Sequence, residues 1–124
     1  MTFGNLALLV FGSLFIAWCA TIPMPAHGAE QRCGTASFYA EQHQGRLMAN
    51  GKPFNMHALT AASWYYPLGT KVTVTAGRKS VVVTITDRGP AKRLHRIIDL
   101  SKAAFARLSP TGQGLVKVCV GVSS

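Results

Sequence analysis

The sequence predicts an all-β fold, a small barrel of five or six strands with one or two short helices. Short apolar or alternating runs recur after residue 30, and such runs are typical of strands. Gly, Pro and Asn separate them, as expected for turns. A helical spacing of apolar residues follows near the C-terminus. So many short strands within roughly 95 residues favour a closed barrel, which leaves no unpaired sheet edge.

Five strands can be assigned from these runs. We expect them at residues 35–39, 58–62, 72–75, 81–86 and 116–120. A hairpin should join the third strand to the fourth, because Gly77 lies between them and can adopt the positive φ that a tight turn requires.

One helix is predicted after Ser101. Serine is a favourable N-cap residue, and Leu100 before it is placed to pack against Phe105 in the first turns. Phe105 and Leu108 mark one apolar face of this helix. Pro110 disfavours a helical conformation for the residue before it, so we expect the helix to end there.

The N-terminal residues 1–28 are interpreted as a secretory signal peptide. No Lys, Arg, Asp or Glu occurs before Glu30, and residues 6–20 form an apolar run shorter than the roughly 20 residues of a membrane span. Ala26 and Gly28 supply the small residues required before a cut. The absence of a basic residue ahead of the run leaves an uncleaved anchor as the alternative. We expect an exported protein of the periplasm or cell envelope, without a stable membrane anchor after cleavage.

Export determines how the cysteines are interpreted. Cleavage would remove Cys19 and leave Cys33 and Cys119 near the two ends of a domain at residues 34–120. A remaining pair in an exported chain predicts a disulfide. In the chain-entropy treatment such a long loop stabilises the fold by roughly 4 to 5 kcal/mol. Two unpaired buried thiols are the alternative.

The chain is strongly basic, with thirteen Lys and Arg against four Asp and Glu, all after residue 29. Such a surface attracts polyanions. In an exported protein we expect peptidoglycan, anionic wall polymers or lipid head groups as partners, and no nucleic acid. A solvated basic face without a partner is the alternative. We expect a monomer.

Seven segments, taken in order, resemble the rare lipoprotein A (RlpA) family. They are residues 34–39 (GTASFY), 45–46 (GR), 49–51 (ANG), 58–62 (ALTAA), 67–70 (PLGT), 87–90 (DRGP) and 97–101 (IIDLS). The resemblance implies a six-stranded double-psi β-barrel, the fold shared with expansins and some endoglucanases. It also implies an endolytic lytic transglycosylase that acts on peptidoglycan glycan strands and favours glycan stripped of stem peptides.

That activity requires an acid and a base. A carboxylic acid protonates the glycosidic oxygen between MurNAc and GlcNAc, and a carboxylate takes the proton of the MurNAc C6 hydroxyl, which closes a 1,6-anhydro ring. One residue with a raised pKa can serve both steps. The resemblance assigns the catalytic carboxylates to Asp87 and Asp99. Tyr39, Asn50 and Arg88 are residue types suited to holding the sugar ring.

One position departs from the family. After Ala-Asn-Gly the family usually has a Glu implicated in catalysis and, three residues later, an Asp, but this chain has Lys52 and Asn55. Lysine is a weak general acid, since its reference pKa is about 10.4, and its charge opposes a developing oxocarbenium ion. Three accounts follow: Glu41 replaces the acid, Asp87 or Asp99 acts alone, or the domain binds glycan without cleaving it. Lys52 is retained as a substrate-binding candidate.

Both aspartates also have structural interpretations. Asp99 precedes the predicted helix, whose dipole favours a carboxylate at its N-terminus, and Asp87 has the position of a turn residue that bonds backbone amides. His43, His57 and His95 match no metal-ligand spacing. We therefore expect no metal and no cofactor.

Two further segments are candidates for ligand contact. Residues 64–66 (WYY) form either a stacking platform for sugar rings or part of the core. A basic segment, formed by Arg88, Lys92, Arg93 and Arg96, lies between the two aspartates. It either contacts wall anions and lowers the pKa of neighbouring carboxylates or forms a solvated loop. A more distant alternative is a basic barrel that binds another protein.

Overall fold

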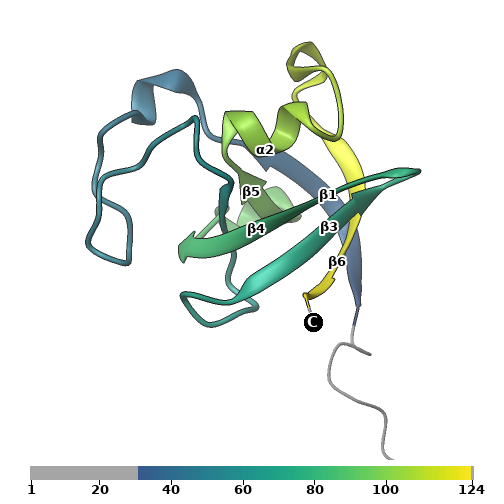
Figure 1. The fold of residues 1–124 in the computed structure, drawn as a ribbon, viewed down its shortest axis with the longest axis horizontal. Coiled ribbons are helices and arrows are strands. Elements are labelled where there is room, and N and C mark those ends of the chain that lie inside the picture. Colours follow the sequence, from purple (N-terminus) through teal and green to yellow (C-terminus); the bar gives the residue numbers. More distant parts are fainter. Residues whose placement is uncertain (1–30, 124) are drawn as a thin grey trace, which may run out of the picture.

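The structure, a computed structural model, describes residues 31–123, and the predicted signal peptide lies outside these residues. The strands are β1 (Arg32–Phe38), β2 (Thr60–Ala62), β3 (Lys71–Ala76), β4 (Lys79–Asp87), β5 (Arg96–Leu100) and β6 (Val116–Val122). They form one closed barrel in the order β1-β5-β2-β4-β3-β6. Figure 1 shows the ribbon of this barrel. The predicted all-β barrel is thereby confirmed. Within residues 31–123, no helix has the length and apolar character to span a membrane.

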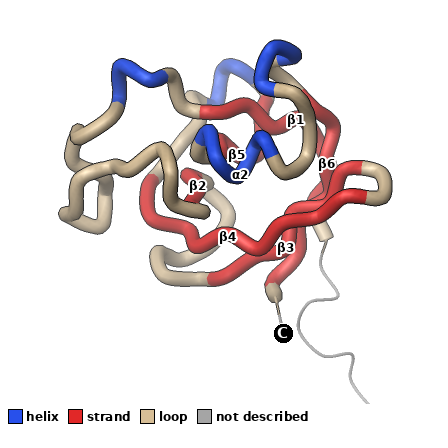
Figure 2. Tube along the Cα trace, turned by 45° about the horizontal axis from the view of Figure 1, so that its top comes forward, coloured by secondary structure: helices blue, strands red, loops and turns tan. Residues whose placement is uncertain are grey.

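The barrel mixes parallel and antiparallel pairs. β1 pairs with β5, and β2 with β4, in parallel, whereas the other four neighbours are antiparallel. The two members of each parallel pair are not consecutive in the chain, so the connection within each pair passes through other strands. The connection between β1 and β2 is long. It carries the 3-10 turn η2 (Glu41–His43) and lies beside the barrel (Figure 2).

The β3–β4 hairpin follows from alternation of side chains. Val72, Val74, Val81 and Val83 face the interior and are almost completely buried, as expected for strands with one face on a core. Gly77 has a φ of 60° in the connection, which confirms the predicted turn and its need for a residue that tolerates positive φ.

The five predicted strands differ from the observed ones by up to three residues at an end, and the largest difference is at β1, which begins at Arg32. β2 begins at Thr60, two residues later than expected, because the Ala58 amide donates to the carbonyl of Asn55 in a turn. β5 was not among the expected strands. Its five residues include the charged Arg96 and Asp99, so the sequence gives neither a long apolar run nor a long alternating pattern there.

Ser101 is the N-cap of α2 (Lys102–Ala106), as predicted: its Oγ accepts from the Ala104 amide at 3.1 Å and donates to the Ala58 carbonyl at 2.5 Å. The helix is shorter than expected, with Arg107 as its C-cap. Phe105 is fully buried, and its ring centroid lies 4.7 Å from that of Phe38. α2 thereby closes the core against β1 and β5.

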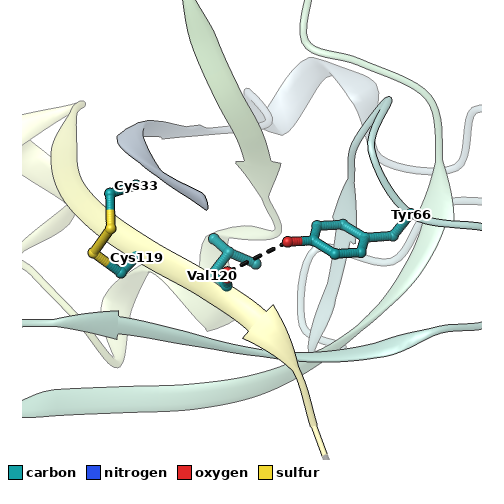
Figure 3. Close-up of a disulfide and its surroundings, with 4 residues drawn as sticks. All are labelled: Cys33, Tyr66, Cys119 and Val120. Atoms are coloured by element: carbon teal, nitrogen blue, oxygen red, sulfur yellow. Dashed lines mark hydrogen bonds between the residues drawn. A yellow bond between two sulfur atoms is a disulfide. The ribbon is translucent and has the colours of Figure 1, made fainter. Parts of the chain in front are cut away.

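The predicted disulfide between Cys33 and Cys119 is present. These two residues are register partners on β1 and β6, so the bond links neighbouring strands (Figure 3). On the same strand, the carbonyl of Val120 accepts a hydrogen bond of 3.3 Å from the Tyr66 hydroxyl (Figure 3). Tyr66 also packs against the core, which confirms that part of the aromatic triplet belongs to it.

Two further 3-10 turns complete the described chain. They are η3 (Lys92–Leu94), between β4 and β5, and η4 (Thr111–Gln113), between α2 and β6. η3 contains part of the basic segment, and its three residues are all exposed.

Candidate active site

The two predicted catalytic aspartates flank one short strand. Ala62 of β2 is the register partner of Asp87 on β4 and of Asp99 on β5. Neighbouring strands are about 4.8 Å apart, so the two backbones stand two strand spacings apart at one level of the barrel. The charge of Asp87 acts on Asp99. The barrel thus brings together carboxylates from two separate sequence motifs.

Strand alternation turns Asp99 away from the core. Its neighbours Ile98 and Leu100 are fully buried in the core, so the Asp99 side chain lies on the opposite face of β5. There its Oδ1 accepts a hydrogen bond of 3.1 Å from the Oγ of Ser37. Ser37 is its register partner on β1 and is itself buried. Ser37, Tyr39, Asp87 and Asp99 are called the carboxylate cluster below.

Burial raises the pKa of Asp99 to about 6. The hydrogen bond from Ser37 and the charges of Arg96 and His43 lower it by less, and the charge of Asp87 adds to the rise. The predicted lowering of the carboxylate pKa by the basic segment is present at Asp99 through Arg96, but desolvation raises the pKa by more, so the net shift is upward. A carboxyl with a pKa near 6 can donate a proton near neutral pH and take it back.

Asp87 is held by three hydrogen-bond donors. Its Oδ1 accepts from the backbone amides of Ala49 and Arg88, both at 2.8 Å. Its Oδ2 accepts from the Tyr39 hydroxyl at 2.7 Å. The predicted bonding of backbone amides is present, and it fixes the carboxylate beside Asp99. Because these described partners all donate, Asp87 acts as an acceptor.

Tyr39 connects Asp87 to an aromatic wall. Burial raises the pKa of Tyr39, as do its hydrogen bond to Asp87 and the negative charges of Asp87 and Asp99. The phenol therefore remains a donor. Its ring is stacked on Phe54 with centroids 4.6 Å apart, and the edge of the His43 ring lies 5.5 Å away. The face of Tyr39 toward Phe54 is thus covered.

Arg88 ties the loop after β2 to the end of β4. Its Nη1 donates to the carbonyl of Ser63 at 2.8 Å and to that of Tyr66 at 2.6 Å. In the same loop, the indole nitrogen of Trp64 donates to the carbonyl of Pro90 at 2.6 Å. At least one guanidinium nitrogen of Arg88 therefore holds the backbone of this loop. Any contact of Arg88 with a ligand would come in addition to these hydrogen bonds.

The two exposed rings of the aromatic triplet each face a cation. Lys92 lies 5.1 Å from the centroid of the Trp64 ring, and Arg32 lies 4.1 Å from that of Tyr65. These contacts cover one face of each ring. A stacking platform for sugars would have to use the faces that the cations leave open.

Glu41 stands apart from the carboxylate cluster. It is exposed and forms an ion pair with Lys102 at the start of α2. The hydrogen bond and charge of Lys102 lower the pKa of Glu41. A general acid requires the opposite shift, so this arrangement does not support Glu41 as the replacement acid.

Asn50 and Lys52 lie on a tight turn beside the cluster. Gly51 has a φ of 87°, and the Asn50 Oδ1 accepts from the Lys52 amide at 2.9 Å. The Asn50 amide donates to the carbonyl of Thr86 at 3.2 Å, which anchors the turn next to Asp87. Lys52 itself is exposed.

A pocket of about 600 Å³, called the turn pocket below, is lined in part by this turn. Its polar lining consists of Asn50, Lys52, Asn55, Thr60, Thr84 and Thr86. Tyr39, Asp87 and Asp99 do not line it. The predicted residues are therefore divided between the cluster and the turn pocket. A second pocket, of about 650 Å³, lies around the disulfide, away from both aspartates.

Sequence reasoning overlooked Ser37 and Phe54, and it considered His43 only as a metal ligand. Ser37 could have been found, since it stands two residues before Tyr39 and side chains at that spacing share a strand face. Phe54 carries no such signal. Among residues 31–123, His, Cys, Asp and Glu form no group of three able to hold a metal ion.

Comparison with known proteins places the chain in a family. The lytic transglycolase family of double-psi β-barrels matches residues 31–120. The probable endolytic peptidoglycan transglycosylase RlpA of Treponema pallidum is 44% identical over 89 residues, which cover 70% of this chain and 28% of that protein. The endolytic peptidoglycan transglycosylase RlpA of Pseudomonas aeruginosa is 41% identical over 100 residues, covering 77% and 29%. The chain thus spans less than a third of these relatives' lengths.

A solved structure agrees on the fold. An expansin of Clavibacter michiganensis in complex with cellohexaose matches with a TM-score of 0.61 at 18% identity, covering 77% of this chain and 51% of that chain. At this identity the similarity concerns the fold alone. Together with the match over residues 31–120, these findings show that the chain belongs to the lytic transglycolase family of RlpA-like double-psi β-barrels.

Proposed function

We propose that this domain is an endolytic peptidoglycan transglycosylase, which cleaves MurNAc–GlcNAc bonds of glycan strands and forms 1,6-anhydro-MurNAc. The observation that carries the proposal is the carboxyl of Asp99, whose pKa burial raises to about 6 beside the anchored Asp87. The names of the relatives give the same reaction class.

Asp99 is the proposed acid and base. Its protonated carboxyl donates its proton to the glycosidic oxygen as the bond between MurNAc C1 and that oxygen breaks. The MurNAc C6 hydroxyl then attacks C1 and passes its proton to the Asp99 carboxylate, which restores the acid. No water is consumed. Asp87, held by its three donors, lies where its negative charge favours the positive charge that develops on the sugar ring.

This assignment does not depend on Lys52. Lys52 lies on the turn and lines the turn pocket, whereas the acid that the reaction requires is supplied within the carboxylate cluster. The second candidate function is glycan binding without cleavage. It is favoured by Lys52 and Asn55, which stand at two positions where the family usually has carboxylates.

Purified protein incubated with sacculi tests these two functions. We expect mass spectrometry to find 1,6-anhydro-MurNAc ends, in larger amounts after an amidase has removed the stem peptides. The Asp99→Asn variant should release none above background. If the wild-type protein yields no such ends but sediments with the glycan, the proposed reaction is refuted and the binding function is supported.

The proposal includes a location outside the cytoplasm and a monomeric state. We place the protein outside the cytoplasm, in the periplasm or envelope, because the Cys33–Cys119 disulfide would persist in an oxidising compartment. We expect a monomer, which light scattering of the purified protein would check. Detection of the protein in the cytoplasmic fraction alone would contradict the location.

A further inference from the structure

We propose that the turn pocket is a subsite for a carboxylate substituent of the glycan, and that Lys52 recognises this carboxylate. The inference rests on the proposed function and adds the chemical class that the neighbouring sugar must carry. In peptidoglycan the carboxylate belongs either to the lactyl group of a bare MurNAc or to a stem peptide.

The turn pocket has the composition of a sugar site. Its volume of about 600 Å³ lies within the usual range of ligand pockets, roughly 300 to 1,000 Å³. Thr60 and Thr84 stand in its lining, as does Thr86, whose hydroxyl donates to the Met48 Sδ at 3.3 Å and keeps its oxygen as an acceptor. Pro53 and Leu68 supply apolar surface. Both apolar residues are exposed to solvent, so a sugar ring can pack on them while its hydroxyls meet the threonines.

The charge of the turn pocket is positive. Among the described residues that line it, Lys52 is the only charged one. Asn55, on the same lining, is neutral at the second position where the family usually has a carboxylate. The usual Glu and Asp would repel an anionic substituent, whereas an ammonium group attracts it. The two replacements therefore change the preferred charge of the ligand in the same direction.

The backbone beneath Lys52 is fixed before any ligand arrives. Its amide donates to the Asn50 Oδ1 and its carbonyl accepts from the Met48 amide, both at 2.9 Å. The side chain alone remains to be ordered by a ligand. A preorganised backbone reduces the entropy that binding must offset.

Two chain segments connect the turn pocket to the carboxylate cluster. Thr86 lines the pocket and immediately precedes Asp87. Ala49, whose amide donates to Asp87, immediately precedes Asn50 of the lining. The proposal thus requires a glycan bound at the cluster to extend over one of these segments, so that an adjacent sugar reaches the pocket.

Three tetrasaccharides of alternating GlcNAc and MurNAc test the inference. The first has free lactyl carboxylates, the second has neutral lactyl methylamides, and the third carries stem peptides. Calorimetry with the Asp99→Asn chain gives their affinities without turnover. An exposed ion pair contributes little, so we expect the free acid to bind about three- to fivefold more tightly than the amide. Higher salt should reduce this preference.

Variants at Lys52 assign the preference to one residue. Lys52→Gln in the same background should remove it, and Lys52→Arg should retain it. Lys79→Gln makes the same charge change on the β3–β4 hairpin, outside the pocket lining, and should retain the preference. If Lys52 strengthens binding of the first ligand, the lactyl group is the source of the carboxylate. If it strengthens only binding of the third, the source is the stem peptide.

Equal affinities for acid and amide, combined with no Lys52-dependent gain for the peptide-bearing ligand, would overturn the subsite. A preference that survives Lys52→Gln, or that Lys79→Gln removes equally, would do the same. These results would leave the proposed function intact if sacculi still release 1,6-anhydro ends. Failure to bind any of the ligands, together with no release of such ends, would refute both proposals.

Discussion

The carboxylate cluster and the neighbouring turn pocket differ in how the fold holds their charged groups. Asp87 and Asp99 are placed by strand register on both sides of Ala62, partly buried and electrostatically coupled. Lys52 is exposed, and only its backbone is fixed. Burial therefore tunes the chemistry of the cluster, whereas the turn can exchange one charge for another without disturbing the barrel. We therefore expect a family departure at the turn to affect ligand choice more than folding.

The largest expected effect comes from breaking the cluster itself. Asp99→Asn keeps the shape and the hydrogen bond from Ser37 but removes the acid. Because general acid–base catalysis typically contributes about 10²- to 10⁴-fold, the release of 1,6-anhydro ends should fall by that factor. The circular dichroism spectrum should not change. An active, folded Asp99→Asn protein would remove the cluster from the reaction.

A smaller loss is expected for Asp87→Asn. The variant loses the charge that stabilises the developing cation, and we expect a rate roughly 10- to 100-fold lower, by comparison with other electrostatic contributions to catalysis. Since the charge of Asp87 raises the pKa of Asp99, the pH above which the rate falls should move downward. If the rate of Asp87→Asn falls at the same pH as the rate of the wild type, the electrostatic coupling between Asp87 and Asp99 is contradicted.

Stability should depend on pH through Asp99. Its folded pKa of about 6 lies above the ordinary value of 3.8, so the folded state binds the proton more tightly. The resulting stabilisation is fully present below about pH 4 and is lost as the pH rises through about 6; after discounting for partial exposure, we expect it to be roughly 1 to 2 kcal/mol. Urea unfolding of the wild type and Asp99→Asn across this range measures it. A constant difference between the two would refute the raised pKa.

The smallest effect is expected at Glu41. Glu41→Gln removes an exposed ion pair with Lys102, and such pairs contribute little. Both the melting temperature and the rate of anhydro-end release should match the wild type. A loss comparable to that of Asp99→Asn would instead identify Glu41 as the replacement acid and would contradict the separation between the cluster and the surface.

The fold was accessible from local patterns, and the site only partly so. Ser101 and Gly77 act through their immediate neighbours, so the helix start and the hairpin turn could be predicted. The disulfide followed from cysteine pairing in a chain predicted to be exported. The proximity of Asp87 and Asp99 depends instead on the register of three strands, which no local pattern contains.

Two electrostatic features could not be predicted from the sequence, because they too depend on the tertiary arrangement. The ion pair of Glu41 with Lys102 joins residues 61 positions apart, so it depends on where η2 and α2 meet. The direction of the Asp99 pKa shift depends on burial, and the basic residues near it in the sequence suggested the opposite sign. Counting charges along a chain cannot replace knowledge of which groups are desolvated.

The rate of anhydro-end release by the wild-type protein, measured against pH on amidase-treated sacculi, tests the central claim most directly. If Asp99 is the proton donor, the rate should fall as the pH rises through about 6, because the acid form is lost. Any residual rate of Asp99→Asn should show no such inflection. A wild-type rate that stays constant between about pH 5 and about pH 8, where a carboxyl with this raised pKa would titrate, would contradict the assignment. An inflection that Asp99→Asn retains would also contradict it.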